Sequence, residues 1–107
     1  MSATYLSYSA TVILQAIGNG CCYGFDIMDA TGLPSGTVYP ALRRMEATGL
    51  VDSAWEKPVI AQREQRPLRK YYELTKAGQH ALSEAAKRYR LADRPVAQPG
   101  KPSRARG

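Results

Sequence analysis

The chain has 107 residues, which is enough for one domain with a single hydrophobic core but leaves little room for a catalytic cleft as well. Its formal net charge is +6, yet residues 1–42 contain no lysine or arginine, and every such side chain lies from Arg43 onward. Because no apolar run approaches the ~18 residues of a membrane span and no signal-peptide pattern opens the chain, we expect a cytoplasmic protein. Because the chain is short for a catalytic cleft, we also expect that it is not an enzyme.

The first predicted helix covers residues 4–17, where apolar side chains recur at helical spacing. They form two stripes, which is more than one small core requires, so one stripe could face a second subunit. Burial within the same domain is the alternative. Asn19 and Gly20 are expected to end this helix in a turn. The stripes consist of Leu6, Ala10, Ile13 and Ile17, and of Tyr5, Tyr8, Val12 and Ala16.

A helix-turn-helix is predicted next. A short second helix covers residues 23–31, and Gly32-Leu33-Pro34 follows it as the turn. The third helix, residues 35–48, is expected to start near Ser35, whose hydroxyl can cap free backbone amides. Pro40 must then lie close enough to the first turn of that helix to be tolerated.

The third helix has a core face and an outer face. Val38, Leu42 and Met45 fall at spacings of four and three, which predicts that they face the core. Gly36 and Thr37 would let the backbone approach a phosphate or a base edge closely, as expected of a recognition helix in the major groove. The outer face that we expect to contact DNA consists of Ser35, Gly36, Thr37, Tyr39, Arg43 and Arg44.

A β-hairpin is predicted after this helix, with one strand over residues 50–55 and its partner over residues 69–74. In the second strand Tyr72 and Leu74 alternate with Tyr71 and Glu73. We therefore expect one of these two pairs to face the core and the other to face outward. The intervening loop, residues 56–67, is long for a hairpin turn. We expect such a tip to be mobile until it meets a ligand.

Positive charge is concentrated between residues 57 and 70, where Glu64 is the one acidic residue. Such clustering suits contact with phosphates, since neutralised phosphates release counterions. A solvated face that keeps the protein soluble is the alternative, and the neighbouring third helix favours DNA. The basic residues are Lys57, Arg63, Arg66, Arg69 and Lys70, of which we expect the last four to contact DNA.

The C-terminal helix is predicted over residues 75–92. Its apolar stripe has no obvious place in a three-helix core, and small residues permit close approach of another helix. We therefore predict a dimerisation element within a single domain of residues 1–92. Residues 93–107 are poor in apolar side chains, which predicts a disordered basic tail that adds weak nonspecific attraction for DNA. The stripe consists of Gly78, Ala81, Leu82, Ala85, Tyr89 and Ala92.

Several motifs follow one another in a specific order. They are Tyr-Gly-Phe-Asp-Ile at residues 23–27, Gly-Thr-Val-Tyr-Pro-Ala-Leu-Arg-Arg-Met-Glu at 36–46, Gly-Leu-Val at 49–51 and Arg-Lys-Tyr-Tyr-Glu-Leu-Thr-Lys-Ala-Gly at 69–78. Together they resemble the PadR family of bacterial transcriptional regulators. The short chain is similar to the small members, which have a winged helix domain followed by one dimerising helix. It differs in having Pro34-Ser35 where the family commonly has Ser-Pro, and in a longer wing.

The predicted elements and this resemblance imply a mainly α fold with a small β-hairpin. This is a winged helix-turn-helix whose N- and C-terminal helices form a dimer interface. The resemblance further implies a homodimer that binds palindromic operator DNA, usually as a repressor released by a ligand. We expect Thr37 and Arg43 near base edges, Tyr39 and Arg44 near phosphates, and the wing in an adjacent minor groove.

A small-molecule effector is a further implication of the resemblance. Aromatic side chains on the two helices proposed for the dimer interface could line a cavity for a flat hydrophobic or aromatic compound. Ordinary aromatic packing in a dimer core is the alternative. The predicted interface and possible effector pocket consist of Tyr5, Tyr8, Val12, Leu82, Ala85 and Tyr89.

Two other functions remain open at this point. Cys21 and Cys22 are adjacent, so they are poorly placed to bridge each other, but with His80 they could serve a thiol- or metal-responsive sensor. They lack Cys-x-x-Cys spacing, and we predict no catalytic residue, metal site or cofactor. The other alternative is an architectural winged helix that binds DNA without reading its sequence.

Overall fold

The computed structural model of the protein describes residues 6–89. Its architecture is mainly α-helical with a two-stranded antiparallel hairpin, which confirms the predicted fold class. None of the helices in residues 6–89 combines the length and the hydrophobicity that a membrane crossing requires. Tyr5, Ala92 and the predicted tail over residues 93–107 lie outside the described residues. The elements are α1 (Tyr8–Gly18), α2 (Gly24–Thr31), α3 (Ser35–Ala47), β1 (Val51–Trp55), α4 (Pro58–Arg63), β2 (Lys70–Leu74) and α5 (Lys76–Tyr89).

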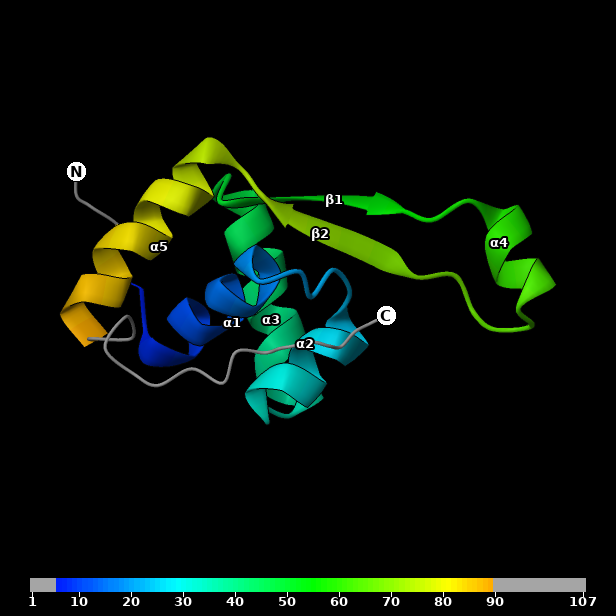
Figure 1. The fold of residues 1–107 in the computed structure, drawn as a ribbon, viewed down its shortest axis with the longest axis horizontal. Coiled ribbons are helices and arrows are strands. Elements are labelled where there is room, and N and C mark those ends of the chain that lie inside the picture. Colours follow the sequence, from blue (N-terminus) through cyan, green and yellow to red (C-terminus); the bar gives the residue numbers. More distant parts are fainter. Residues whose placement is uncertain (1–5, 90–107) are drawn as a thin grey trace.

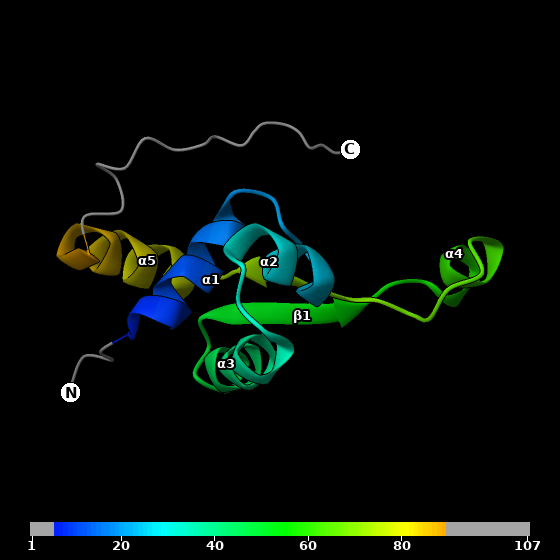
Figure 2. The same ribbon diagram turned by 90° about the horizontal axis from the view of Figure 1, so that it is seen from below.

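The hairpin projects away from the helices, with α4 at its tip and α5 at the opposite end of the molecule (Figure 1). Helix α1 contacts α2, α3, α5 and β2, which makes it the central element of the core. Figure 2 shows α3 on one side of β1, where its outward face is left uncovered by the other helices. The largest fully buried side chains belong to Ile13, Leu14, Ile27, Leu42, Val38, Val51 and Thr11.

Helix α1 begins at Tyr8 because Ser7 is its N-cap. The Ser7 hydroxyl oxygen accepts a hydrogen bond from the Ala10 amide at 3.1 Å, and the Ser7 backbone is extended, so the predicted start at residue 4 is wrong. Both Ile13 and Leu14 are fully buried, and Ala16 is 7% exposed. Most side chains of the two predicted stripes are therefore buried within one chain.

The turn between α2 and α3 ends at Pro34, which is the N-cap of α3 and provides no side-chain capping bond. Ser35 is already the first helical residue, so the prediction that its hydroxyl caps the helix is wrong. Pro40 lies inside the helix rather than in its first turn, where it cannot donate to the Gly36 carbonyl. Burial of Val38, Leu42 and other apolar side chains on the inner face offsets this cost of about 3 kcal/mol.

The hairpin pairs Ala54 with Tyr71 and Trp55 with Lys70 in antiparallel register. The segment before α2 joins this sheet, because the Tyr72 amide donates a hydrogen bond to the Cys22 carbonyl at 2.6 Å. Tyr72 is 8% exposed and Glu73 is exposed, so of the two alternating sides of the second strand the one with Tyr72 faces the core. The wing is thereby connected to the start of the helix-turn-helix.

The predicted loop over residues 56–67 is wrong for its central part, which folds as α4. Pro58 occupies the first turn of this short helix, where a missing N–H costs nothing. Ala61 is 4% exposed, and its carbonyl accepts a hydrogen bond from the Arg66 amide at 3.1 Å. The wing tip therefore has internal packing and a backbone bond that closes its return to β2.

Helix α5 packs against α1 of the same chain and against the end of the hairpin. Ala85 is 1% exposed, and Gly78 lies so close to Leu50 that a Cβ there would overlap the Leu50 carbonyl oxygen. Ala81, Leu82 and Tyr89 pack against the same core. The interpretation that this stripe has no place in the core is wrong, and the role of the helix in dimerisation stays a prediction.

Candidate nucleic-acid interface

The outward face of α3 carries most of the side chains predicted to contact DNA. Because Val38, Ala41, Leu42 and Met45 are buried, the helical period turns the remaining positions to the surface. Ser35, Gly36, Arg43 and Arg44 are exposed, and Thr37 is half-buried. Neither Arg43 nor Arg44 forms an ion pair within residues 6–89. Two guanidinium groups next to each other on an uncovered helix face are thus available to an anionic partner.

Tyr39 lies on the same face and is 40% exposed. Its ring packs directly over Gly24 at the start of α2, where any Cβ would overlap the phenol ring. The glycine therefore permits a close contact that fixes the aromatic side chain between the two helices. This contact holds the partly exposed tyrosine at the surface of α3.

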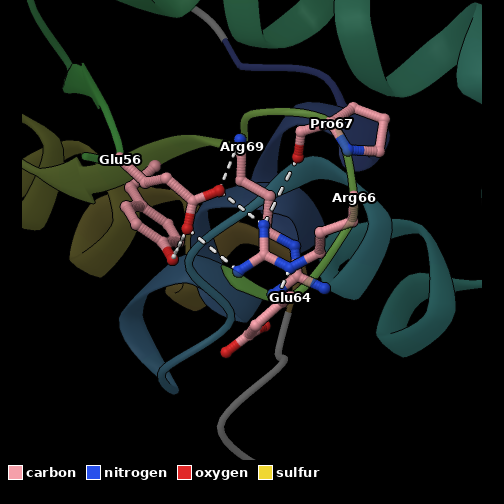
Figure 3. A network of polar contacts seen from close by, with 6 residues as sticks. Glu56, Glu64, Arg66, Pro67 and Arg69 are labelled. Carbon is pink, nitrogen blue, oxygen red and sulfur yellow. Dashed lines mark hydrogen bonds and ion pairs between the residues drawn. The ribbon is translucent and has the colours of Figure 1, made fainter. Parts of the chain in front are cut away.

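Arg66, which the sequence predicts at the DNA, is instead paired inside the wing. Its guanidinium donates to both carboxylate oxygens of Glu56, with Nη2 at 2.9 Å from Oε2, and its Nε lies 3.0 Å from Oε1 of Glu64 (Figure 3). The Glu56 side chain is 1% exposed and that of Arg66 is 18% exposed. Hydrogen bonds from Arg66 above all hold the pKa of the Glu56 carboxyl at about 2, against the opposing effect of burial.

Arg69 is held by its backbone and by its side chain. Its amide donates to Oε1 of Glu56 at 2.9 Å, and its guanidinium carbon lies 4.2 Å from the centre of the Tyr23 ring. Tyr23 in turn packs against Tyr71, with 5.4 Å between ring centroids. The stacked aromatic ring restricts the arginine to one region at the root of the wing.

Lys70 bridges the wing and α3. Its ammonium lies 3.7 Å from Oε1 of Glu46, whose Oε2 accepts a hydrogen bond from the Ser53 hydroxyl. The same ammonium lies 5.6 Å from the centre of the exposed Trp55 ring. Lys70 is therefore paired with a carboxylate of the same chain, whereas Arg63 at the tip is exposed and has no ion pair within the described part of the chain.

The sequence and the fold of this chain match those of known proteins. The model of the Transcriptional regulator PadR-like family matches residues 13–84, a span that runs from α1 through α3 and the wing into α5. The chain belongs to the PadR family. No match was found among proteins with curated descriptions.

Solved structures of other PadR proteins share the fold. A PadR family transcription regulator from hypervirulent Clostridium difficile is 29% identical, with a TM-score of 0.67 over 81% of this chain and 92% of that one. A PadR-like transcription factor from Bacteroides fragilis is 26% identical, with a TM-score of 0.64 over 78% and 82% of the two chains. A PadR-like transcriptional regulator from Bacillus cereus, at 24% identity, shows the same fold with a TM-score of 0.61 over 78% and 82% of the two chains.

In this PadR protein two of the residues predicted for a dimer interface, Tyr8 and Tyr89, contact each other within one chain. Tyr8 and Tyr89 contact each other edge to face with 5.4 Å between ring centroids, and the Tyr89 hydroxyl donates to the Leu6 carbonyl at 2.8 Å. Val12 and Leu82 are half-buried. This supports aromatic packing inside the subunit as the first role of these tyrosines.

A surface groove on this PadR protein lies apart from Tyr8 and Tyr89. An open groove of about 530 Å³ runs between the end of α1, the end of β2 and α5, and of the predicted pocket residues within 6–89 only Leu82 lines it. Both apolar and polar side chains line this groove. The lining residues are Ile17, Gly18, Glu73, Leu74, Gln79, Leu82 and Ser83.

Cys21 and Cys22 form no disulfide within the described residues, and Cys22 is exposed. Burial, followed by the charges of Asp26 and Glu73, raises the pKa of the Cys22 thiol, which disfavours the thiolate. That thiol donates to the Gly20 carbonyl at 3.3 Å. No group of three or more His, Cys, Asp or Glu within residues 6–89 could hold a metal ion, and His80 is exposed on α5.

Three residues of the interface were missed by the sequence analysis: Glu56, Glu46 and Tyr23. Each acts through a partner that the hairpin brings close, namely Arg66, Lys70 and Arg69. A carboxylate at the end of a predicted strand, beside a strongly basic segment, was the available signal for Glu56. No comparable pattern in the sequence points to Glu46 or Tyr23.

Proposed function

We propose that this PadR family member is a sequence-specific transcriptional regulator in the cytoplasm that binds a palindromic operator as a homodimer. The observation that carries the proposal is the uncovered face of α3, where Arg43 and Arg44 are exposed beside a basic wing. A domain of this size with one outward helix and a projecting hairpin suits insertion of the helix into a major groove. The matching family consists of transcriptional regulators.

In this proposal Thr37 and Arg43 lie near base edges, whereas Tyr39 and Arg44 lie near phosphates. An arginine can bind guanine through two hydrogen bonds, a contact that discriminates against the wrong base by about 1–3 kcal/mol. Phosphate contacts add affinity without direct sequence information. Arg63, Arg69 and Lys70 would add contacts from the wing.

The proposed dimer uses the outer parts of α1 and α5. Tyr8 is 42% exposed and Val12 is half-buried, so apolar surface remains there after the helices pack within one chain. A two-fold dimer needs half-sites separated by about one helical turn of DNA, roughly 34–36 Å between centres. A molecular mass of two chains in light scattering is the expected result, and a monomer at working concentration would contradict this geometry.

Ligand-responsive repression is the finer part of the proposal. A flat hydrophobic or aromatic effector would bind beside α1 and α5 and alter operator affinity. Linkage then requires that operator DNA alter effector affinity by the same factor. Fluorescence titration with aromatic compounds, repeated with and without operator, tests this reciprocity, and a compound that binds without any effect on DNA affinity is no effector.

Selection of bound duplexes from a random pool is the experiment that tests the proposed function. We expect a palindrome with two similar half-sites. Recovery of no preferred sequence, together with a steep dependence of affinity on salt, would instead identify an architectural DNA-binding protein. The pool thus separates specific from nonspecific binding in one measurement.

Single substitutions then test the recognition helix. Arg43→Ala should weaken binding to the selected operator by about 1–3 kcal/mol and relax the preference at one base pair. Arg44→Ala should weaken binding to all sequences and lower the slope of affinity against salt by about 0.9. Lys87→Ala is the matched control, because it removes one positive charge from an exposed position on α5. If both helix variants bind like the control, α3 is not the recognition helix.

A further inference from the structure

Glu56 is the one charged residue that is buried within residues 6–89. It lies where β1 ends and the wing tip begins, and its carboxylate accepts hydrogen bonds from three residues that follow α4 (Figure 3). The donors are the Arg66 guanidinium, the Arg69 amide at 2.9 Å and the Tyr71 hydroxyl at 3.3 Å. A buried carboxylate with this many donors is an organised site rather than a surface ion pair.

The contacts of Glu56 close the wing on itself. The Glu56 amide donates to the Arg69 carbonyl at 2.8 Å while the side chain accepts from the Arg69 amide, so both strands are joined at the base of the tip. Arg66 reaches back to the same carboxylate from the end of the tip. We name this set of contacts among Glu56, Arg66, Arg69 and Tyr71 the wing clamp.

The wing clamp holds two of the basic side chains that the sequence predicts to contact DNA, Arg66 and Arg69. Arg66 is neutralised by Glu56, and its side chain is mostly covered. Arg69 is fixed through its backbone by the clamp and through its guanidinium by Tyr23, which immediately precedes α2. The wing is thus positioned relative to the helix-turn-helix, not only folded within itself.

We propose that Glu56 is a positioning residue for DNA binding: it keeps the wing in one geometry, so that Arg69 and Arg63 meet the DNA backbone, and it withdraws Arg66 from DNA contact. This inference rests on the proposed function as a DNA-binding regulator. Its physical basis is preorganisation, since a wing that is already ordered does not lose conformational freedom on binding.

The direction in which one substitution, Glu56→Gln, changes the affinity for DNA separates positioning from simple electrostatics. Glu56→Gln removes a negative charge from a DNA-binding surface and releases the Arg66 guanidinium. Attraction to DNA phosphates alone would therefore tighten binding. Loss of positioning would instead weaken binding to the operator, by about three- to tenfold for the cost of ordering one or two side chains.

Glu64→Gln is the matched control. It removes the same charge from the same wing and contacts the same arginine, but the Glu64 side chain is 55% exposed and lies outside the clamp. We expect its operator affinity to equal or slightly exceed that of the unmodified protein. Glu56→Asp is the second test variant, because it keeps the charge but shortens the reach of the carboxylate, and it should also weaken operator binding.

Hydrogen exchange of the free protein reports the clamp without DNA. The amides of Arg66 and Glu64 are bonded within the wing tip, and they should exchange faster in Glu56→Gln while the amides of α1 and α3 keep their protection. Retained protection of those two helices establishes that the variant is folded. This measurement does not depend on the proposed function.

The combined experiment measures operator affinity, affinity for random DNA and hydrogen exchange for the three variants. Weaker operator binding by both Glu56 variants, with faster exchange in the wing tip and a neutral Glu64→Gln, supports the proposal. Operator binding by Glu56→Gln that is unchanged or tighter overturns it, as does unchanged exchange in the tip. Absence of sequence preference in the unmodified protein would overturn the proposed function, and exchange would still decide whether the clamp orders the wing.

Discussion

A methyl group added at Gly78 should destabilise the fold, although glycine is a poor helix former. Gly78 lies in the first turns of α5, and a Cβ there would overlap the Leu50 carbonyl oxygen and lie 3.0 Å from the carbonyl carbon. The obstacle is backbone at the start of β1, which cannot rotate away as a side chain would. The same turn is fixed by Thr75, whose hydroxyl accepts from the Gly78 amide at 2.9 Å and donates to the Gly49 carbonyl.

Two opposing effects set the magnitude. Replacing glycine with alanine inside a helix gains about 1 kcal/mol of helix propensity. Forcing extra volume into a packed site costs about 1–3 kcal/mol, and more where the neighbour cannot move. Because the neighbour of Gly78 is backbone, we expect Gly78→Ala to lower the free energy of unfolding by about 2 kcal/mol, net of the propensity gain. For a domain of this size that corresponds to a melting temperature lower by about 8–16 °C.

Urea unfolding followed by circular dichroism measures this change. Gly36→Ala is the matched control, because Gly36 also lies inside a helix but a Cβ there would meet nothing within 4 Å. The control should be more stable than the unmodified protein by about 0.5–1 kcal/mol. If Gly78→Ala is also as stable as the unmodified protein, the close approach of α5 to the hairpin has been misjudged.

Three further predictions concern the wing, the thiol and the recognition helix. The Glu56 carboxyl has a folded-state pKa of about 2 against an ordinary value of 4.5. Its contribution to the free energy of unfolding is therefore present above pH 4.5 and is lost as the pH falls toward 2. In Glu56→Gln, the free energy of unfolding should not show this loss between pH 4.5 and 2. In a Cys21→Ser background, Cys22 should react with iodoacetamide more slowly at pH 8 than a free cysteine, because its raised pKa lowers the fraction of thiolate. A faster reaction would contradict the environment assigned to this thiol. Gly24→Ala should displace the Tyr39 ring and weaken DNA binding. Gly20→Ala is its control and should change stability alone, because a Cβ there meets no neighbour although the backbone φ is +107°. Equal DNA affinities of the two variants, after correction for stability, would show that Tyr39 is not part of the interface.

Much of the fold followed from local patterns. The spacing of Val38, Leu42 and Met45 predicted which side of the third helix is buried, because the period of a helix fixes which residues share a face. The hairpin was predicted within one residue at both strands, since strand boundaries follow short polar and glycine-containing segments. These features depend on neighbours along the chain.

Other features depended on the third dimension. The start of α1 differed because Ser7 caps the helix, which the apolar periodicity does not show. Helix α3 begins at Ser35 as predicted, but its N-cap is Pro34 and not Ser35. Helix α4 was missed because its formation depends on Pro58 and on a closing contact between Glu56 and Arg66. A short helix of this kind has too few residues for a periodic pattern to identify it.

The sequence by itself determined the helix-turn-helix, the family resemblance and the face of α3 that turns outward, since helical period and turn residues act over a few positions. Only the tertiary structure decided which basic side chains of the wing are free. Arg66 and Lys70 look like Arg63 in the sequence, yet the first two are paired with Glu56 and Glu46 and the third is not paired within the described chain. The physical reason is that an ion pair depends on distance in space, and the hairpin register sets that distance between residues far apart in the chain.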